Sequence, residues 1–354
     1  MPSVNRNSFI FNSNESLAAD SPAVRIPVAV IVAIVAVVVI EFFLWHNVDW
    51  YSDQAAKYWL EKDGTQNNTA DVMFLGSSVT LHSVNPLQVD SREVSTSNLA
   101  LNGCRTNQQY FLLKRQLMHL ETPPSHVVIE LRAVDPNHQS WLYGPSFRFW
   151  MHYGEFNQGG NMIWAPDRYV DFTGNRLFAS YSFRQAIDNW MTQCAREKTL
   201  ADTTRKRNLK IRDEFARTKG FAKGGFSQGA EESDLKIKPD EIEWRVSPMG
   251  EYWLDKLLTL LREKRIQPIF FVPPVPSAVQ EKRDASGYDA ELLAFVKGKE
   301  IQLGIRLPLI QPPHEAFKLS DFADTHHFSW QGSVTLSNYL HDELPVFVRE
   351  HTAP

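Results

Sequence analysis

The chain has 354 residues, 43% of them hydrophobic, and a formal net charge of −4. This length and composition suit one large globular domain or two smaller ones, and the slight negative charge gives no reason to expect a nucleic-acid partner. The two cysteines, Cys104 and Cys194, fit no metal-ligand spacing. They are compatible with one disulfide in an exported domain or with two free thiols.

The N-terminal part predicts a membrane anchor. Residues 1–25 are rich in Ser, Asn and Ala and are expected to form a disordered cytoplasmic tail. Residues 26–45 (IPVAVIVAIVAVVVIEFFLW) are almost wholly apolar, and about 20 residues suffice to span a bilayer. No small-residue cleavage site follows, so we expect an uncleaved, single-pass signal anchor in the inner or plasma membrane. A connector over 46–70 then leads to a domain on the periplasmic or extracellular side.

From residue 71 to the C-terminus, short apolar runs alternate with amphipathic segments. Strands are expected at 72–75, 127–131 and 267–274 and within 305–313, and helices at 106–120, 249–266, 289–304 and 329–348. This alternation predicts an α/β domain over 71–354, a three-layer sandwich with a central parallel sheet covered on both faces. Ligands in such domains bind beyond the carboxyl ends of the strands.

The alternation breaks down between about residues 138 and 248. This stretch includes the basic run REKTLADTTRKRNLKIRDEFARTKGFAKGG, residues 196–225. We interpret it as a long, partly helical insertion over the active edge of the sheet. The basic run is either a solvated face or a groove for an anionic polymer or lipid headgroups.

Ser78 lies in FLGSSVT, where an apolar strand ends. A serine at a strand-to-helix turn can direct its hydroxyl and its own N–H to one point, which suits attack on an acyl carbonyl. The alternative is an ordinary helix N-cap. Gly103, in SNLALNGCRT, can bring its N–H close to a ligand or can simply form a turn.

DTHHFSWQG, residues 324–332, offers a base for this serine. Asp324 and His327 are three residues apart, so the carboxylate can orient the imidazole. His326 is then expected to point elsewhere. A metal site is the rival interpretation, but adjacent histidines rarely reach one ion and no further ligand cluster is evident, so we expect no metal and no cofactor.

These segments together resemble the SGNH/GDSL hydrolase superfamily. FLGSSVT resembles its first block, Gly-Asp-Ser, with Ser77 in place of the aspartate and Ser78 in place of the nucleophile. NLALNG resembles the second block, which implies that the N–H groups of Ser78 and Gly103 line the oxyanion hole. DTHHFSWQG resembles the last block, in which a glycine stands five residues after the histidine. This spacing selects His327 as the base, with Asp324 as its partner. The resemblance implies an SGNH-type, flavodoxin-like sheet.

The third block departs from the superfamily pattern. HVVIELRAVD, residues 126–135, lacks the oxyanion asparagine that the superfamily usually carries near Val134. Arg132 and Asn137 are the candidates to bind substrate in its place.

The anchor adds a likeness to particular members of the superfamily. The anchor at 26–45 resembles the anchors of superfamily members that act on alginate, bacterial cellulose and teichoic acid. The resemblance implies an extracytoplasmic O-acyltransferase, with acetyl as the expected acyl group, acting on a cell-surface or exported polysaccharide through an acyl-Ser78 intermediate. It also implies a polytopic membrane-bound O-acyltransferase as the partner that supplies the acyl group. Two alternatives stay open: an esterase that uses the same residues, and a non-catalytic polymer-binding subunit of a secretion complex.

Overall fold

The structure is a computed structural model. It describes residues 27–47, 57, 70–132, 151, 155, 166–199, 202, 204–223, 226 and 228–351. Most of the expected connector at 46–70 lies outside these residues.

A five-stranded parallel sheet forms the centre of the domain, so the predicted α/β class and parallel sheet are confirmed. The strands are β1 (Val72–Leu75), β2 (Thr96–Asn98), β3 (His126–Glu130), β4 (Gln267–Phe271) and β5 (Leu309–Ile310). Their order in the sheet is β2-β1-β3-β4-β5. The carboxyl ends of all five strands therefore lie at one edge.

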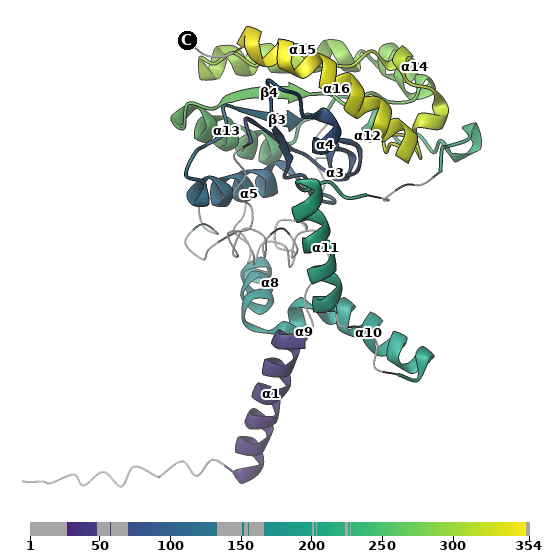
Figure 1. The fold of residues 1–354 in the computed structure, drawn as a ribbon. Coiled ribbons are helices and arrows are strands. Elements are labelled where there is room, and N and C mark those ends of the chain that lie inside the picture. Colours follow the sequence, from purple (N-terminus) through teal and green to yellow (C-terminus); the bar gives the residue numbers. More distant parts are fainter. Residues whose placement is uncertain are drawn as a thin grey trace, which may run out of the picture.

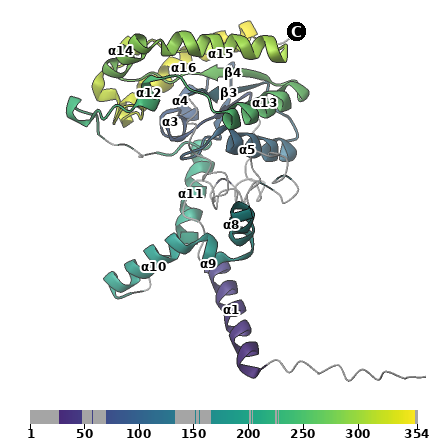
Figure 2. The same ribbon diagram turned by 180° about the vertical axis from the view of Figure 1, so that it is seen from behind.

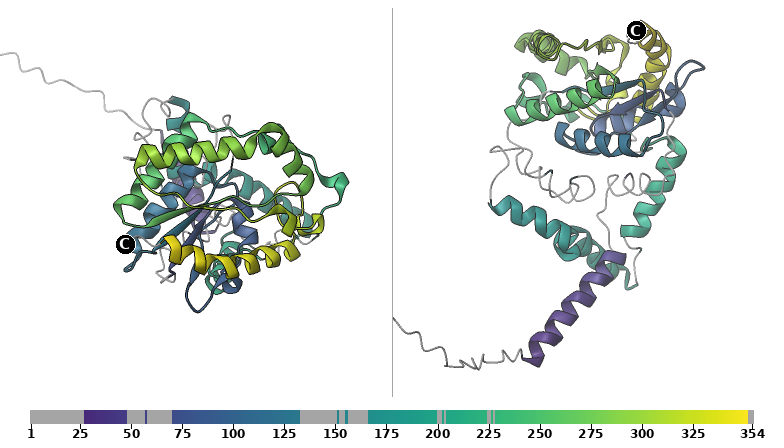
Figure 3. Two further views of the ribbon diagram at one scale, coloured as in Figure 1. Left: turned by 90° about the horizontal axis from the view of Figure 1, so that it is seen from above. Right: turned by 90° about the vertical axis from the view of Figure 1, so that its left-hand side faces the viewer.

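Helices cover both faces of this sheet (Figure 3). One face carries α5 (Thr106–His119), α13 (Pro248–Glu263) and α15 (Tyr288–Leu303); the other carries α3 (Ser78–Ser83), α4 (Pro86–Val89) and α16 (Trp330–His351). Strand side chains alternate between faces, so Met73 and Leu75 pack with the first set, while Val72 and Phe74 pack with the second. All four are fully buried, which explains the continuous apolar run of β1.

Strand β2 and helix α14 (Ser277–Ser286) are among the elements of the domain that were not expected from the sequence. The edge strand β2 is Thr-Ser-Asn, which has no apolar periodicity, and it is held by its pairing with β1. Helix α14 joins β4 to α15. In addition, β4 ends at Phe271, three residues before the expected end at 274.

The predicted insertion contains several helices. They are α8 (Pro166–Leu177), α9 (Ala179–Ser182), α10 (Arg184–Glu197), α11 (Thr204–Thr218), a short 3₁₀ helix at Glu232–Asp234 and α12 (Pro239–Ile242). Figures 1 and 2 show α8 and α9 between the sheet domain and α1 (Val28–Asn47), with α10 extending to one side. Helix α11 runs from this region up to the sheet domain, and α12 lies at the sheet domain itself. Among the described residues, the parts of the insertion that reach the sheet domain are the C-terminal end of α11, where Phe215 packs with Leu81, and the segment from Phe226 through α12.

Helix α1 is long and apolar enough to cross a membrane. Its side chains are exposed along most of its length, but Leu44 is buried against Ala179 and Phe183. Glu41, the one charged residue of the helix, accepts hydrogen bonds from the N–H and hydroxyl of Ser180. Helix α1 is thus packed against α9 and α10 at its C-terminal end.

Candidate active site

Ser78 is the first residue of α3, directly beyond the carboxyl end of β1. Ser77 is the N-cap of this helix, and its hydroxyl accepts from the N–H of Val79 at 3.3 Å. The alternative N-cap role is therefore filled by Ser77, which leaves the Ser78 hydroxyl available for another partner.

That partner is His327. Ser78 Oγ lies 2.8 Å from His327 Nε2, and His327 Nδ1 lies 2.7 Å from Asp324 Oδ2. Three residues predicted from the sequence are thus joined in one hydrogen-bonded relay, although Ser78 and His327 are 249 positions apart. Such a relay can transfer the serine proton to imidazole during nucleophilic attack.

The loop that carries His327 is held from several sides. Asp324 Oδ1 accepts the backbone N–H groups of His326 and His327 at 2.9 and 2.7 Å, and the N–H of Ala323 donates to the carbonyl of His327 at 2.7 Å. The ring of Phe226 stacks on the His327 imidazole with centroids 4.4 Å apart. The imidazole is therefore fixed in orientation before any substrate arrives.

Asp324 is ionised at neutral pH. Burial opposes its ionisation, but hydrogen bonds from the His327 ring and from the N–H groups of His326 and His327 bring its pKa well below the usual range. An ionised carboxylate beside Nδ1 favours the tautomer that carries its proton on Nδ1. Nε2 of His327 is then free to accept the Ser78 proton.

Glu130 locks the turn that presents the serine. This buried carboxylate, at the end of β3, accepts the N–H and hydroxyl of Ser77 at 2.8 and 2.6 Å. It also accepts the N–H and hydroxyl of Thr80 at 3.2 and 2.6 Å. The turn is tight as well, because a Cβ on Gly76 would lie 2.3 Å from Thr80 Oγ1.

Two backbone N–H groups are available to bind an oxyanion. Gly103 lines the same cavity as Ser78 and has a φ of +62°, a conformation that favours glycine. Within the described part of the chain, neither the Ser78 N–H nor the Gly103 N–H has a hydrogen-bond partner. Both are therefore free to donate to a developing negative charge.

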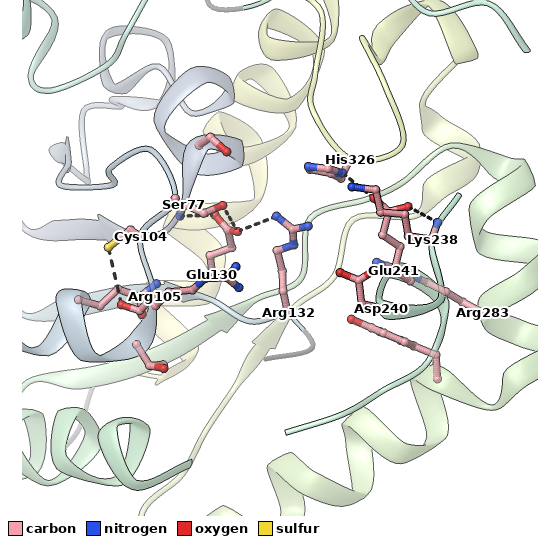
Figure 4. Close-up of a pocket in the computed structure, with 15 residues that line it drawn as sticks. Ser77, Cys104, Arg105, Glu130, Arg132, Lys238, Asp240, Glu241, Arg283 and His326 are labelled. Carbon is pink, nitrogen blue, oxygen red and sulfur yellow. Dashed lines mark hydrogen bonds and ion pairs between the residues drawn. The ribbon is translucent and has the colours of Figure 1, made fainter. Parts of the chain in front are cut away.

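The cavity beside Ser78 has a volume of about 320 Å³. Its wall carries charges of both signs, from Arg105, Arg132, Arg283, Lys238, Asp240, Glu130 and Glu241. In Figure 4 the Arg132 side chain stands between Ser77 and Glu130 on one side and His326 and Glu241 on the other. Arg132 thus lies where a substrate would sit, whereas Asn137, the other predicted substrate-binding residue, and Val134 lie outside the described residues.

His326 does not bond to Ser78, but its ring lines the same cavity. Its Nδ1 lies 3.1 Å from Glu241 Oε1, and its ring centroid lies 4.1 Å from that of His327. Ligand atoms of Asp324, His326 and His327 lie close enough together to hold a metal ion. However, each Nδ1 already faces a carboxylate and Nε2 of His327 faces Ser78, so this donor set is arranged as hydrogen-bonded pairs.

Sequence reasoning missed three contributors to the site. The sequence does contain a signal for Glu130, because a carboxylate at the end of an apolar strand is expected to be buried and then needs hydrogen-bond donors. Glu241 and Phe226 had none, because they come from the insertion and meet their histidines only in the folded chain. Asn98, in the same segment as Gly103, has a structural role: its amide donates to the carbonyls of Thr80 and Val84.

Comparison of this sequence with family models and with curated proteins finds no match. Cys104 and Cys194 form no disulfide with each other, and Cys104 borders the cavity.

Proposed function

We propose that this protein is a membrane-anchored serine acyltransferase that transfers an acyl group, such as acetyl, to a hydroxyl of a cell-surface or exported polysaccharide. The observation that carries the proposal is the Ser78–His327–Asp324 relay at the wall of a polar cavity. The unpaired N–H groups of Ser78 and Gly103 add the means to stabilise an oxyanion.

The geometry suits a two-step reaction. Ser78 Oγ attacks the acyl carbonyl while its proton passes to His327 Nε2, and the N–H groups of Ser78 and Gly103 hold the oxyanion. His327 then gives the proton to the leaving group, which departs and leaves an acyl-Ser78 ester. An acceptor hydroxyl attacks this ester, its proton passes through His327 to Ser78 Oγ, and the serine is regenerated.

Two further features support this proposal. The strand order is the 2-1-3-4-5 order of flavodoxin-like sheets, which agrees with the resemblance to the SGNH/GDSL superfamily. Helix α1 can hold the domain at a membrane, where a polytopic O-acyltransferase could deliver the acyl group. We propose that the domain lies on the periplasmic or extracellular side, where exported polymers are found.

A serine-directed fluorophosphonate tests whether the protein is an enzyme. With the full chain in detergent, we expect covalent labelling of Ser78, identified by mass spectrometry, and no labelling of Ser78→Ala. The turnover of p-nitrophenyl acetate should fall in that variant by on the order of 10⁵-fold or more. Labelling that survives in Ser78→Ala but is lost in Ser77→Ala would move the nucleophile to Ser77. An unlabelled wild-type chain would favour a non-catalytic binding subunit.

A second measurement separates a transferase from an esterase. Both reactions pass through acyl-Ser78, and they differ in whether water or a sugar hydroxyl takes the acyl group. The wild-type chain, given p-nitrophenyl acetate and cello-oligosaccharides, should yield acetylated oligosaccharide that mass spectrometry detects. Release of acetate alone, with every oligosaccharide acceptor tried, would make the protein an esterase.

A further inference from the structure

The site contains a second histidine–carboxylate pair that the relay does not use. His327 pairs with Asp324 at 2.7 Å, and the adjacent His326 pairs with Glu241 at 3.1 Å. Glu241 comes from α12 in the insertion and is itself buried. Two neighbouring imidazoles are thus each oriented by a carboxylate from a different part of the chain.

The surroundings of Glu241 determine which nitrogen of His326 carries its proton. Burial opposes ionisation of Glu241, but hydrogen bonds from His326, the Thr325 hydroxyl and the Lys238 N–H lower its pKa to about 2. Burial, with further contributions from Arg132 and His327, lowers the pKa of His326 below its usual value despite the hydrogen bond to Glu241, so the neutral ring predominates at pH 7. A neutral ring beside a carboxylate carries its proton on Nδ1, so Nε2 is a hydrogen-bond acceptor.

This acceptor is unused within the described part of the chain. His326 Nε2 has no hydrogen-bond partner there, although the ring lines the cavity that also holds Ser78. His326 and His327 have ring centroids 4.1 Å apart. Two hydroxyl groups on adjacent carbons of one ligand could therefore each meet one imidazole.

We propose that His326 binds the acceptor by accepting a hydrogen bond from the hydroxyl next to the one that attacks. The proposal rests on the proposed acyl transfer and specifies its acceptor as a vicinal diol. The attacking oxygen forms a bond to the acyl carbon, the bond from that carbon to Ser78 Oγ breaks, and the attacking proton passes through His327 to Ser78 Oγ. The second hydroxyl keeps its proton and donates to His326 Nε2. Water has no second hydroxyl, so His326 favours transfer over hydrolysis.

The test compares a diol with a matched monoalcohol. The full chain in detergent receives p-nitrophenyl acetate with either trans-1,2-cyclohexanediol or cyclohexanol, and the ester formed per hydroxyl is measured against acetate released. In the wild type, the ratio of ester formed per hydroxyl to acetate released should be roughly two- to tenfold higher with the diol than with cyclohexanol. This is the factor expected from one net hydrogen bond. His326→Ala should reduce this factor to about one, whatever its overall rate.

Two more variants make the outcome specific. Glu241→Leu should also abolish the preference for the diol, because His326 then loses the partner that holds its proton on Nδ1. Glu241→Gln retains an acceptor oxygen and should keep part of the diol preference. His314→Ala, a histidine outside the cavity, should keep the full wild-type ratio. A wild type without a diol preference, or a His326→Ala variant that retains it, would overturn the role of His326 while acyl-Ser78 still forms. Failure to form acyl-Ser78 at all would overturn the acyl-transfer proposal beneath it.

Discussion

At the scale of single residues, the site depends on carboxylates that fix the protons of their neighbours. Asp324 accepts one ring N–H and two backbone N–H groups, so it both holds the loop and sets the tautomer of His327. Glu130 holds the turn that carries Ser78 in a similar way, because it accepts four hydrogen bonds from Ser77 and Thr80. The nucleophile and its base are therefore each positioned by a buried or half-buried anion.

The first prediction concerns Asp324→Asn. An asparagine can keep the loop bonds through its carbonyl oxygen, but its amide would face His327 Nδ1 and favour the wrong tautomer. We expect an unchanged circular dichroism spectrum and a fall in acyl turnover on the order of 10³–10⁴-fold. Activity within tenfold of the wild type would show that this carboxylate does not orient the base.

The second prediction concerns acid stability. The folded-state pKa of Glu241 is about 2, below its unfolded value of about 4.3, so its contribution to stability is complete above the unfolded value. That contribution is lost as the pH falls from there toward 2. Thermal unfolding of the full chain in detergent should therefore show a steeper fall of Tm over this range for the wild type than for Glu241→Gln. Parallel Tm curves would contradict the assignment.

At the scale of elements, the start of α16 sets the position of the histidine loop. A Cβ at Gly332 would lie 1.8 Å from the backbone oxygen of Asp321, which belongs to the 3₁₀ helix Leu319–Asp321 just before the loop. The loop is further closed by a bridge between Phe322 and Phe328, both buried. The close approach of α16 to this 3₁₀ helix therefore requires a residue without a side chain.

The third prediction follows from that contact. Gly332→Ala should destabilise the chain by about 1–3 kcal/mol through overpacking, and should reduce acyl turnover because the loop carrying His327 shifts. The matched control is Gly298→Ala in α15, where a Cβ would have no neighbour within 4 Å. The free energy of unfolding of Gly298→Ala should be about 0.5–1 kcal/mol higher than that of the wild type, because alanine is more stable than glycine inside a helix. Equal unfolding temperatures for the two variants would refute the steric argument.

The elements that could be predicted from the sequence are those with a strong apolar pattern. The runs at 72–75 and 267–271 form strands, and 249–263 forms a helix, because each buries a continuous or periodic set of large side chains. Strand β2 escaped prediction because its three residues are polar and are buried through pairing with β1. The His326–Glu241 pair escaped for a different reason: its partners are 85 positions apart, and only the packing of α12 brings them together.

At the scale of the whole molecule, helix α1 is attached to the rest of the protein by side-chain packing as well as by the chain. Leu44 and Trp45 contact the cluster of Ala179, Phe183 and Ala186, and Glu41 bonds to Ser180. The N-terminal two thirds of α1 remains exposed and apolar. A lipid bilayer is the natural environment for such a surface.

The fourth prediction tests this anchor. The full chain should remain in the membrane pellet after alkaline carbonate extraction. Replacing Ile34 and Val38 by aspartate should cost about 5–7 kcal/mol of insertion energy and move the chain to the soluble fraction. Ile301→Asp, at an exposed position of α15, should leave the fractionation unchanged. Retention of the double aspartate variant in the pellet would show that α1 is not what holds the chain at the membrane.

The separation of Ser78 and His327 has a consequence for synthesis. The serine is translated 249 residues before its base, and α16, which packs on α3 and α4, follows that base in the chain. A nascent chain that has not reached residue 327 therefore carries Ser78 without the His327 imidazole. The contacts of α16 with α3 and α4 can form only after α16 has also been synthesised. A chain interrupted at any point before residue 327 would lack the proposed base, so the activation of Ser78 depends on a segment that is translated long after the serine itself.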